Sequence, residues 1–134
     1  MSRLVISDTV PSADEWLRKA KADEKATENG MYLLHNGVVR KTAKAKVRKG
    51  EDALPVTGME FSYDKEKVEA AIEEAEKYEG IYYIKVWLNS GKLNVGDDIM
   101  LVLVGGDIRP RVIDALQLLV GKIKNECVVE KEAY

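Results

Sequence analysis

The fold is decided by one stretch of the sequence, residues 99–111, which reads IMLVLVGGDIRPR. Its first six residues are all apolar and predict a buried strand. The Gly105-Gly106-Asp107 segment predicts a turn, and Arg109-Pro110-Arg111 opens a helical pattern in which proline suits the first turn. A helix start favours anions through its free N–H groups and its dipole. The paired arginines therefore indicate an anion site, with ordinary surface charge at a turn as the competing interpretation.

The helix that follows carries an apolar stripe with one lysine at its margin. At about 100° per residue, Lys122 points away from the stripe into solvent, and Lys124 lies at its edge. A lysine at such a margin either covers the core with its stem or lines a pocket, where partial burial lowers the pKa and suits acid–base chemistry. The helical periodicity alone leaves both roles of Lys124 open. The stripe itself consists of Val112, Ile113, Leu116, Leu119, Val120 and Ile123.

The rest of the chain alternates between strand and helix patterns. Strands are predicted at residues 4–6, 31–39, 56–61, 81–88 and 99–104, with a shorter one at 92–95. Helices are predicted at residues 12–22 (N-cap Ser12), from Asp64 to Gly80, and at 110–125, and residues 127–129 link the last one to Lys131. Residues 40–53 are basic and aperiodic and predict a mobile loop. This order predicts one α+β domain, residues 1–134, with an antiparallel or mixed sheet and packed helices.

Composition limits the classes of function. The 134 residues carry a net charge of −2 with 46% hydrophobic content, which predicts one soluble domain without a general affinity for nucleic acid. The sequence contains neither a signal-peptide pattern nor an apolar run of the ~20 residues that span a bilayer, so we expect a cytoplasmic protein. A single cysteine excludes an internal disulfide and a Cys-cluster zinc site. We expect no metal site.

Several other residues have both a structural and a functional interpretation. His35 suits a strand residue with a satisfied side chain, and ligand contact is its alternative. Cys127 suits packing better than nucleophilic catalysis because no histidine partner is apparent. Arg40 opens the basic loop, which is either solvated or able to hold a phosphate. Lys131, between Glu130 and Glu132, by itself suits an ordinary charged terminus.

Taken in order, four motifs resemble the large, catalytic subunit of molybdopterin synthase. A glycine-led apolar strand ends in Gly37-Val38-Val39-Arg40, matching G-x-V-R, and residues 56–61 are similar to V-x-x-L-E-Y. Residues 91–97 match G-x-L-x-V-G-D in full. The last helix keeps the family's Arg and A-x(8)-K register and leads to a K-x-E-like terminus. That register places Arg109, Ala115, Lys124, Lys131 and Glu132. The resemblance as a whole covers residues 4–132.

The resemblance implies an α/β-hammerhead-like fold and sulfur transfer without a metal or redox cofactor. A small ubiquitin-like subunit would insert its Gly-Gly thiocarboxylate tail, and sulfur would pass to cyclic pyranopterin monophosphate to form the dithiolene of molybdopterin, in molybdenum cofactor biosynthesis. The family forms a homodimer of large subunits with a small subunit at each end, a heterotetramer. By this resemblance the catalytic residues are Lys124 and Lys131. The substrate-binding residues are Val38, Val39, Arg40, Ile108, Arg109 and Glu132.

Three departures from the family pattern keep alternatives open. Ile108 replaces a family histidine, Leu88-Asn89 replaces a His-Arg pair, and Val128 and Glu130 replace a proline and a tryptophan. One alternative is therefore a divergent, non-catalytic homologue that serves as a dimeric partner-binding module. A weaker alternative is a phosphate or nucleic-acid binder that acts through residues 40–49, against which the acidic balance argues.

Overall fold

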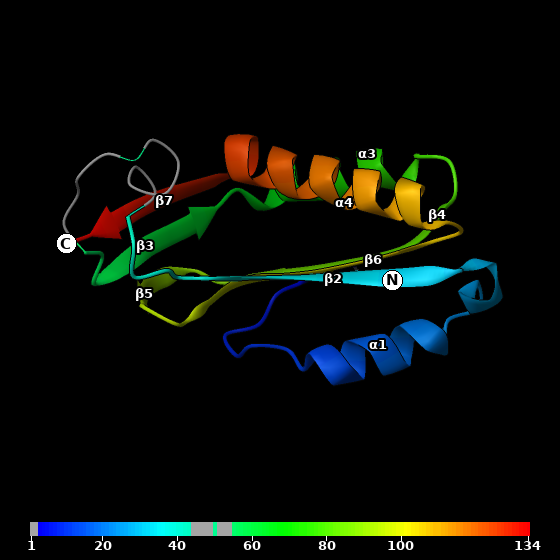
Figure 1. Ribbon diagram of the computed structural model, residues 1–134, viewed down its shortest axis with the longest axis horizontal. Helices are drawn as coiled ribbons and strands as arrows, with labels where there is room; N and C mark the ends of the chain where they lie inside the picture. Colours follow the sequence, from blue (N-terminus) through cyan, green and yellow to red (C-terminus); the bar gives the residue numbers. More distant parts are fainter. Residues whose placement is uncertain (1–2, 44–49, 51–54) are drawn as a thin grey trace.

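The computed structural model describes residues 3–43, 50 and 55–134 and contains two sheets and three α-helices within them (Figure 1). The predicted mobile loop, residues 40–53, lies mostly outside the described residues. The elements are β1 (Leu4–Val5), α1 (Ala13–Lys21), η1 (Ala26–Glu28), β2 (Met31–Val38), β3 (Gly58–Tyr63), α3 (Lys65–Glu76), β4 (Ile81–Leu88), β5 (Gly91–Asn94), β6 (Asp98–Gly106), α4 (Arg109–Lys122), η2 (Ile123–Cys127) and β7 (Val128–Ala133).

Strand β6 forms the centre of the larger sheet, whose order is β1-β4-β6-β2. It pairs antiparallel with both neighbours, and β1 adds to β4 in parallel. Every residue of β6 after Asp98 is buried, as the apolar run predicts. The predicted turn at residues 105–107 is wrong in its first two residues, because both glycines continue the strand. A Cβ on Gly106 would lie 2.7 Å from Val112 Cγ2, so glycine there lets α4 approach the sheet closely.

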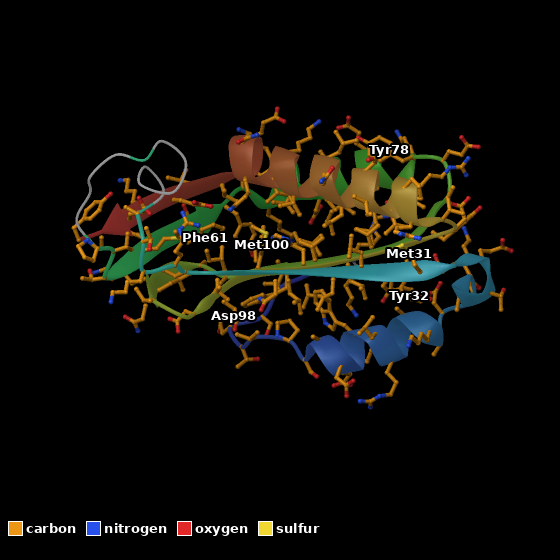
Figure 2. All side chains as sticks on the ribbon, viewed as in Figure 1. Met31, Tyr32, Phe61, Tyr78, Asp98 and Met100 are labelled. Atoms are coloured by element: carbon orange, nitrogen blue, oxygen red, sulfur yellow. The ribbon has the colours of Figure 1, made fainter. Side chains whose placement is uncertain are left out.

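Helices cover both faces of this sheet (Figure 1). α3 and α4 pack on one face over the main core, and α1 packs on the other through Trp16 and Ala20. Figure 2 shows the alternation along β2, with Met31 on the α4 side and Tyr32 on the α1 side. The predicted cap of α1 is confirmed, since the Ser12 side chain accepts a hydrogen bond from the Glu15 N–H.

A second sheet, of order β5-β3-β7, extends the fold beyond the end of α4 (Figure 1). Its inner face buries Met59, Phe61 and Leu93 in the main core. The prediction that residues 127–129 form only a short link is wrong: β7 pairs antiparallel with the whole of β3. The segment is short and half charged, so its alternation is weak, and its strand conformation depends on pairing with a distant part of the chain.

The predicted α+β class with antiparallel and mixed sheets is confirmed by this arrangement. α3 begins at its predicted cap, because the Asp64 side chain accepts a hydrogen bond from the Lys67 N–H. None of the helices built from the described residues is long and apolar enough to cross a bilayer. Together the two sheets bring the end of β2, the end of α4 and strand β7 to one end of the molecule (Figure 1).

Candidate functional site

The exit of β2 fixes the backbone of the first candidate residues. The pairing of β2 with β6 shifts register between Gly37 and Val38, after which Val38 is exposed and Val39 is buried. The Val39 N–H donates to the Asp97 carbonyl at 2.9 Å, which ties this exit to the turn before β6. Arg40 then donates from Nε to the Thr42 carbonyl at 2.8 Å and is exposed. Toward the residues that the structure describes, the guanidinium makes this one hydrogen bond, and its other donors can bind an anion.

Lys124 lies in η2, a five-residue π-helix that continues α4. Two buried residues, Ile123 and Cys127, anchor this turn in the core, and Lys124 itself is exposed. Lys122, predicted to be solvated, instead forms an ion pair with Glu74 of α3. Within the described part of the chain, Lys124 has no such carboxylate partner. π-turns inside helices recur at functional sites, and this one presents an unpaired ammonium group.

His35 lies on the face of β2 that α4 covers. Side chains alternate along a strand, so His35 shares this face with Met31, Leu33 and Gly37. The side chain is partly buried. Burial lowers the pKa of the imidazole, and the nearby charge of Lys124 lowers that pKa further. The imidazole is therefore mainly neutral at pH 7.

Lys131 and Glu132 lie in the second sheet. Lys131 is exposed and lies opposite Glu60 of β3, which in turn lies opposite Lys92 of β5. Both Lys131 and Glu132 line a surface groove of about 360 Å³ over the three strands. Tyr134 Oη donates to Glu132 Oε1 at 3.2 Å. This groove is lined by Lys131 and not by Lys124.

Ile108 and Arg109 lie at the opposite end of the sheet. Both are exposed at the start of α4, two and three residues after β6 ends at Gly106. Along β6, Gly106 pairs with Met31 at the beginning of β2, and Asp98 pairs with Val38 at its end. The strand between these points is roughly 26 Å long at the usual rise per residue. Figure 2 labels Met31 near one end of this sheet and Asp98 well away from it along the strands.

Arg111 has a partner within the chain. Its guanidinium contacts Asp107 Oδ2 at 2.7 Å and Glu79 Oε1 at 3.4 Å. Asp107 also accepts a hydrogen bond from the N–H of Ile108, the residue that precedes α4, at 2.7 Å. The paired arginines are therefore not equivalent: an internal acidic partner explains Arg111, and Arg109 alone stays available to an external anion.

Cys127 is buried at 4% exposure, and burial raises the pKa of its thiol. This environment suits packing, as predicted, because a raised pKa removes the reactive thiolate. Among the residues that the structure describes, no group of three or more His, Cys, Asp or Glu side chains could hold a metal ion.

Residues 7–126 match the family model described as MoaE protein. The chain belongs to this family. Its membership supports a role in molybdenum cofactor biosynthesis and confirms the family that the motifs indicate. A search of curated proteins finds no match.

Solved structures agree with the MoaE family fold. Molybdopterin synthase from Staphylococcus aureus matches with a TM-score of 0.72 at 19% identity, over 98% of this chain and 90% of that one. Molybdopterin cofactor biosynthesis protein E from Burkholderia multivorans gives 0.75 at 16%, over 100% and 84%. A chain of the complex of subunits 1 and 2 of molybdopterin-converting factor from Helicobacter pylori gives 0.70 at 17%, over 99% and 90%. At these identities the likeness shows the fold.

Proposed function

We propose that this chain is the large subunit of a molybdopterin synthase. In this role it passes sulfur from the C-terminal thiocarboxylate of a small ubiquitin-like subunit to cyclic pyranopterin monophosphate, which forms the molybdopterin dithiolene. Membership of the MoaE family supports the reaction class. The fold that the chain shares with a subunit in the Helicobacter pylori two-subunit complex supports a small partner subunit.

Lys124 is the observation that carries the proposal. Its ammonium group has no carboxylate partner in the described structure, whereas its neighbour Lys122 is paired with Glu74. An unpaired ammonium at a fixed turn can bind a thiocarboxylate or phosphate and stabilise the negative charge that develops during acyl transfer. Lys131, in the groove on the second sheet, would hold the tail of the small subunit on its way to Lys124.

Arg40 is the proposed phosphate ligand on the same end of the molecule. Its free guanidinium donors match the geometry of a phosphate group. Val38 and Val39 lie directly before Arg40, the first exposed and the second in the core. The Val39 N–H is hydrogen-bonded to the Asp97 carbonyl, which fixes the backbone there. These residues would position the pyranopterin near Lys124.

Arg109 and Ile108 can join this site only from a second copy. Within one chain about 26 Å of β6 separates them from the end of β2. A two-fold homodimer would bring the α4 start of one copy to the β2 exit of its partner. We therefore include a homodimer in the proposal, with two composite sites and a small subunit bound at each.

The alternative is a non-catalytic MoaE homologue that binds partners. The observation that favours it is Ile108, which is 52% exposed where the family has a histidine. Purified protein, thiocarboxylated small subunit and cyclic pyranopterin monophosphate distinguish the two functions. A synthase forms one molybdopterin for every two thiocarboxylates consumed, because a dithiolene contains two sulfur atoms. A binding module retains the small subunit on a sizing column and forms no molybdopterin.

A further inference from the structure

Strand β2 is an open edge of the larger sheet, because β6 pairs with it on one side only. Figure 1 shows β2 in front of the other strands of this sheet, with no helix or strand along its outer side. None of its eight residues is Lys, Arg, Asp, Glu or Pro. The apolar side chains of residues 31–34 stay partly exposed, whereas every residue of β6 after Asp98 is buried. β2 is therefore a long, uncharged edge strand.

The other strand edges in the described part of the chain are short or charged. β1 covers two residues of β4, and the two edge strands of the second sheet have four and six residues. Their charged residues are Lys85 in β4, Lys92 in β5, and Glu130, Lys131 and Glu132 in β7. Soluble proteins use short edge strands and charged side chains to prevent pairing with another chain. The contrast indicates that β2 is an edge left open for pairing.

The backbone of β2 has hydrogen-bonding groups on its outer side. The Asn89 N–H, directly after β4, donates to the Ile99 carbonyl at 2.8 Å, so the backbone groups of Ile99 face β4. Because these groups alternate along a strand, the even-numbered residues of β6 face β2, where their partners up to the register shift are odd-numbered. The backbone groups of Tyr32, Leu34 and Asn36 therefore point away from β6. Among the described residues they have no backbone partner on that side.

We propose that β2 pairs antiparallel with β2 of a second copy and joins the two larger sheets into one. A two-fold axis at right angles to the sheet produces this pairing and keeps the α4 helices of both copies on one face. Opposite residues in a sheet share a face, and faces alternate along β2, so the axis passes through a residue and not between two. Leu34 lies near the middle of β2 and has an apolar side chain and outward backbone groups. We therefore place the axis at Leu34, which then packs against Leu34 of the second copy.

This pairing brings together the two arginines of the composite site. Val38 comes next to Gly30 of the second copy, two residues before Arg40. The Gly30 N–H donates to the Gly106 carbonyl of its own chain at 2.8 Å, and Arg109 follows Gly106 by three residues. Arg40 of one copy and Arg109 of the other thus lie at the same end of the joined sheet. The inference rests on the homodimer of the proposed function, to which it adds the contact surface, and it is independent of the sulfur-transfer chemistry.

The first experiment is disulfide trapping in Leu34→Cys. Hydrogen-bonded residue pairs in an antiparallel sheet have Cα atoms about 5.5 Å apart, within the range of a disulfide, so mild oxidation should give a cross-linked dimer. Tyr82→Cys is the matched control, because Tyr82 is 38% exposed on β4, on the other side of β6, and should form no cross-link. The native Cys127 is buried and should not react. A folded Leu34→Cys that cross-links no more than Tyr82→Cys overturns the proposal.

The second experiment places charges at the axis and measures the dimer by sedimentation equilibrium. Leu34→Lys and Leu34→Glu should each raise the dissociation constant of the dimer by about 10-fold or more, because like charges then lie opposite each other. An equimolar mixture of the two variants should dimerise again, since the lysine of one copy then faces the glutamate of the other. Tyr82→Lys, on the far side of the same sheet, should leave the dissociation constant unchanged.

The outcomes separate the interface from the chemistry. An unmodified chain that sediments as a monomer, or a mixture that dimerises no better than either Leu34 variant alone, overturns the proposal. A monomeric chain whose complex with the small subunit is lost in Leu34→Lys also overturns it, since the edge then binds that subunit. A dimer that cross-links through Leu34→Cys and forms no molybdopterin supports the interface and contradicts the proposed function.

Discussion

Arg40 and Arg109 lie at opposite ends of β6. Arg40 follows β2, the strand whose last residue pairs with Asp98 at the start of β6, and Arg109 follows Gly106 at the end of β6. Both are exposed, and neither forms an ion pair within the described residues. Two such arginines cannot bind one phosphate in a single copy, since roughly 26 Å of strand separates the two ends. They can do so where two copies meet. A shared site has a consequence for mixed dimers.

Arg40→Ala and Arg109→Ala should each lose activity alone and restore it when combined. If each site takes Arg40 from one copy and Arg109 from the other, a mixed dimer keeps one intact site. After equal mixing and reassembly, half of the dimers are mixed, so activity should return to about a quarter of the unmodified value. Molybdopterin formation measures this restoration.

The control for this experiment combines Arg40→Ala with Lys124→Ala. Both residues lie at the same end of one copy, so every site in the mixed dimer lacks one of them, and no activity should return. Restoration in this control, or its absence in the first mixture, contradicts the shared site.

Stability should be sensitive to truncation of Leu119 in α4 and insensitive to truncation of its neighbour Leu118. Leu119 is 2% exposed and packs in the main core, whereas Leu118 is 55% exposed. Leu119→Ala should lower the free energy of unfolding by about 2–5 kcal/mol through lost burial and a cavity. Leu118→Ala should change it by less than about 0.5 kcal/mol. Urea unfolding measures both, and equal effects would contradict the packing described for α4.

His35 should make the folded chain less stable in mild acid. Its pKa is lowered in the folded state, so the unfolded chain binds the proton more readily once the pH falls below the usual 6.5. The free energy of unfolding should therefore be highest above that pH and should decrease as the pH is lowered further. In His35→Phe the slope between about pH 7 and 5.5 should be smaller. Denaturant unfolding at each pH tests this, and parallel curves would contradict it.

Gly80 should tolerate alanine less well than Gly91. Both adopt positive φ, +80° and +92°, where alanine costs about 1–2 kcal/mol. A Cβ on Gly80 would also overlap the Asp107 carboxyl, which Arg111 holds in place, whereas nothing lies within 4 Å at Gly91. Gly80→Ala should therefore lower the unfolding midpoint in urea more than Gly91→Ala. The reverse order would contradict the packing of the β6–α4 junction.

The sequence predicted those elements whose pattern is local. Apolar runs and caps at Ser12 and Asp64 located the helices and most strands, because capping and periodicity depend on neighbouring residues. Strand β7 was missed because its pairing with β3 is a long-range contact. The two glycines at the end of β6 resembled a turn in the sequence. They are needed instead for the close approach of α4 and of Tyr32, which is a matter of tertiary packing.

In the candidate site too, local motifs predict some features and only the folded structure shows the others. Motif register located Lys124 and Arg40, and the structure supplies what register lacks: which lysine is paired, and which end of β6 each arginine occupies. The structure explains Arg111 by its ion pairs with Asp107 and Glu79 instead of by a bound anion. The sequence patterns did not predict these pairs. The charge of Lys124 lowers the pKa of His35, an interaction between two distant parts of the sequence that local patterns do not predict.

The most direct test is single-turnover sulfur transfer from a radiolabelled small-subunit thiocarboxylate to cyclic pyranopterin monophosphate. Lys124→Ala and Lys122→Ala remove the same side chain two residues apart, one unpaired and one paired with Glu74. Lys124→Ala should slow transfer by about 100-fold or more, and Lys122→Ala should stay within about 2-fold of the unmodified chain. Equal transfer rates in the two folded variants would contradict a role for Lys124 in the chemistry.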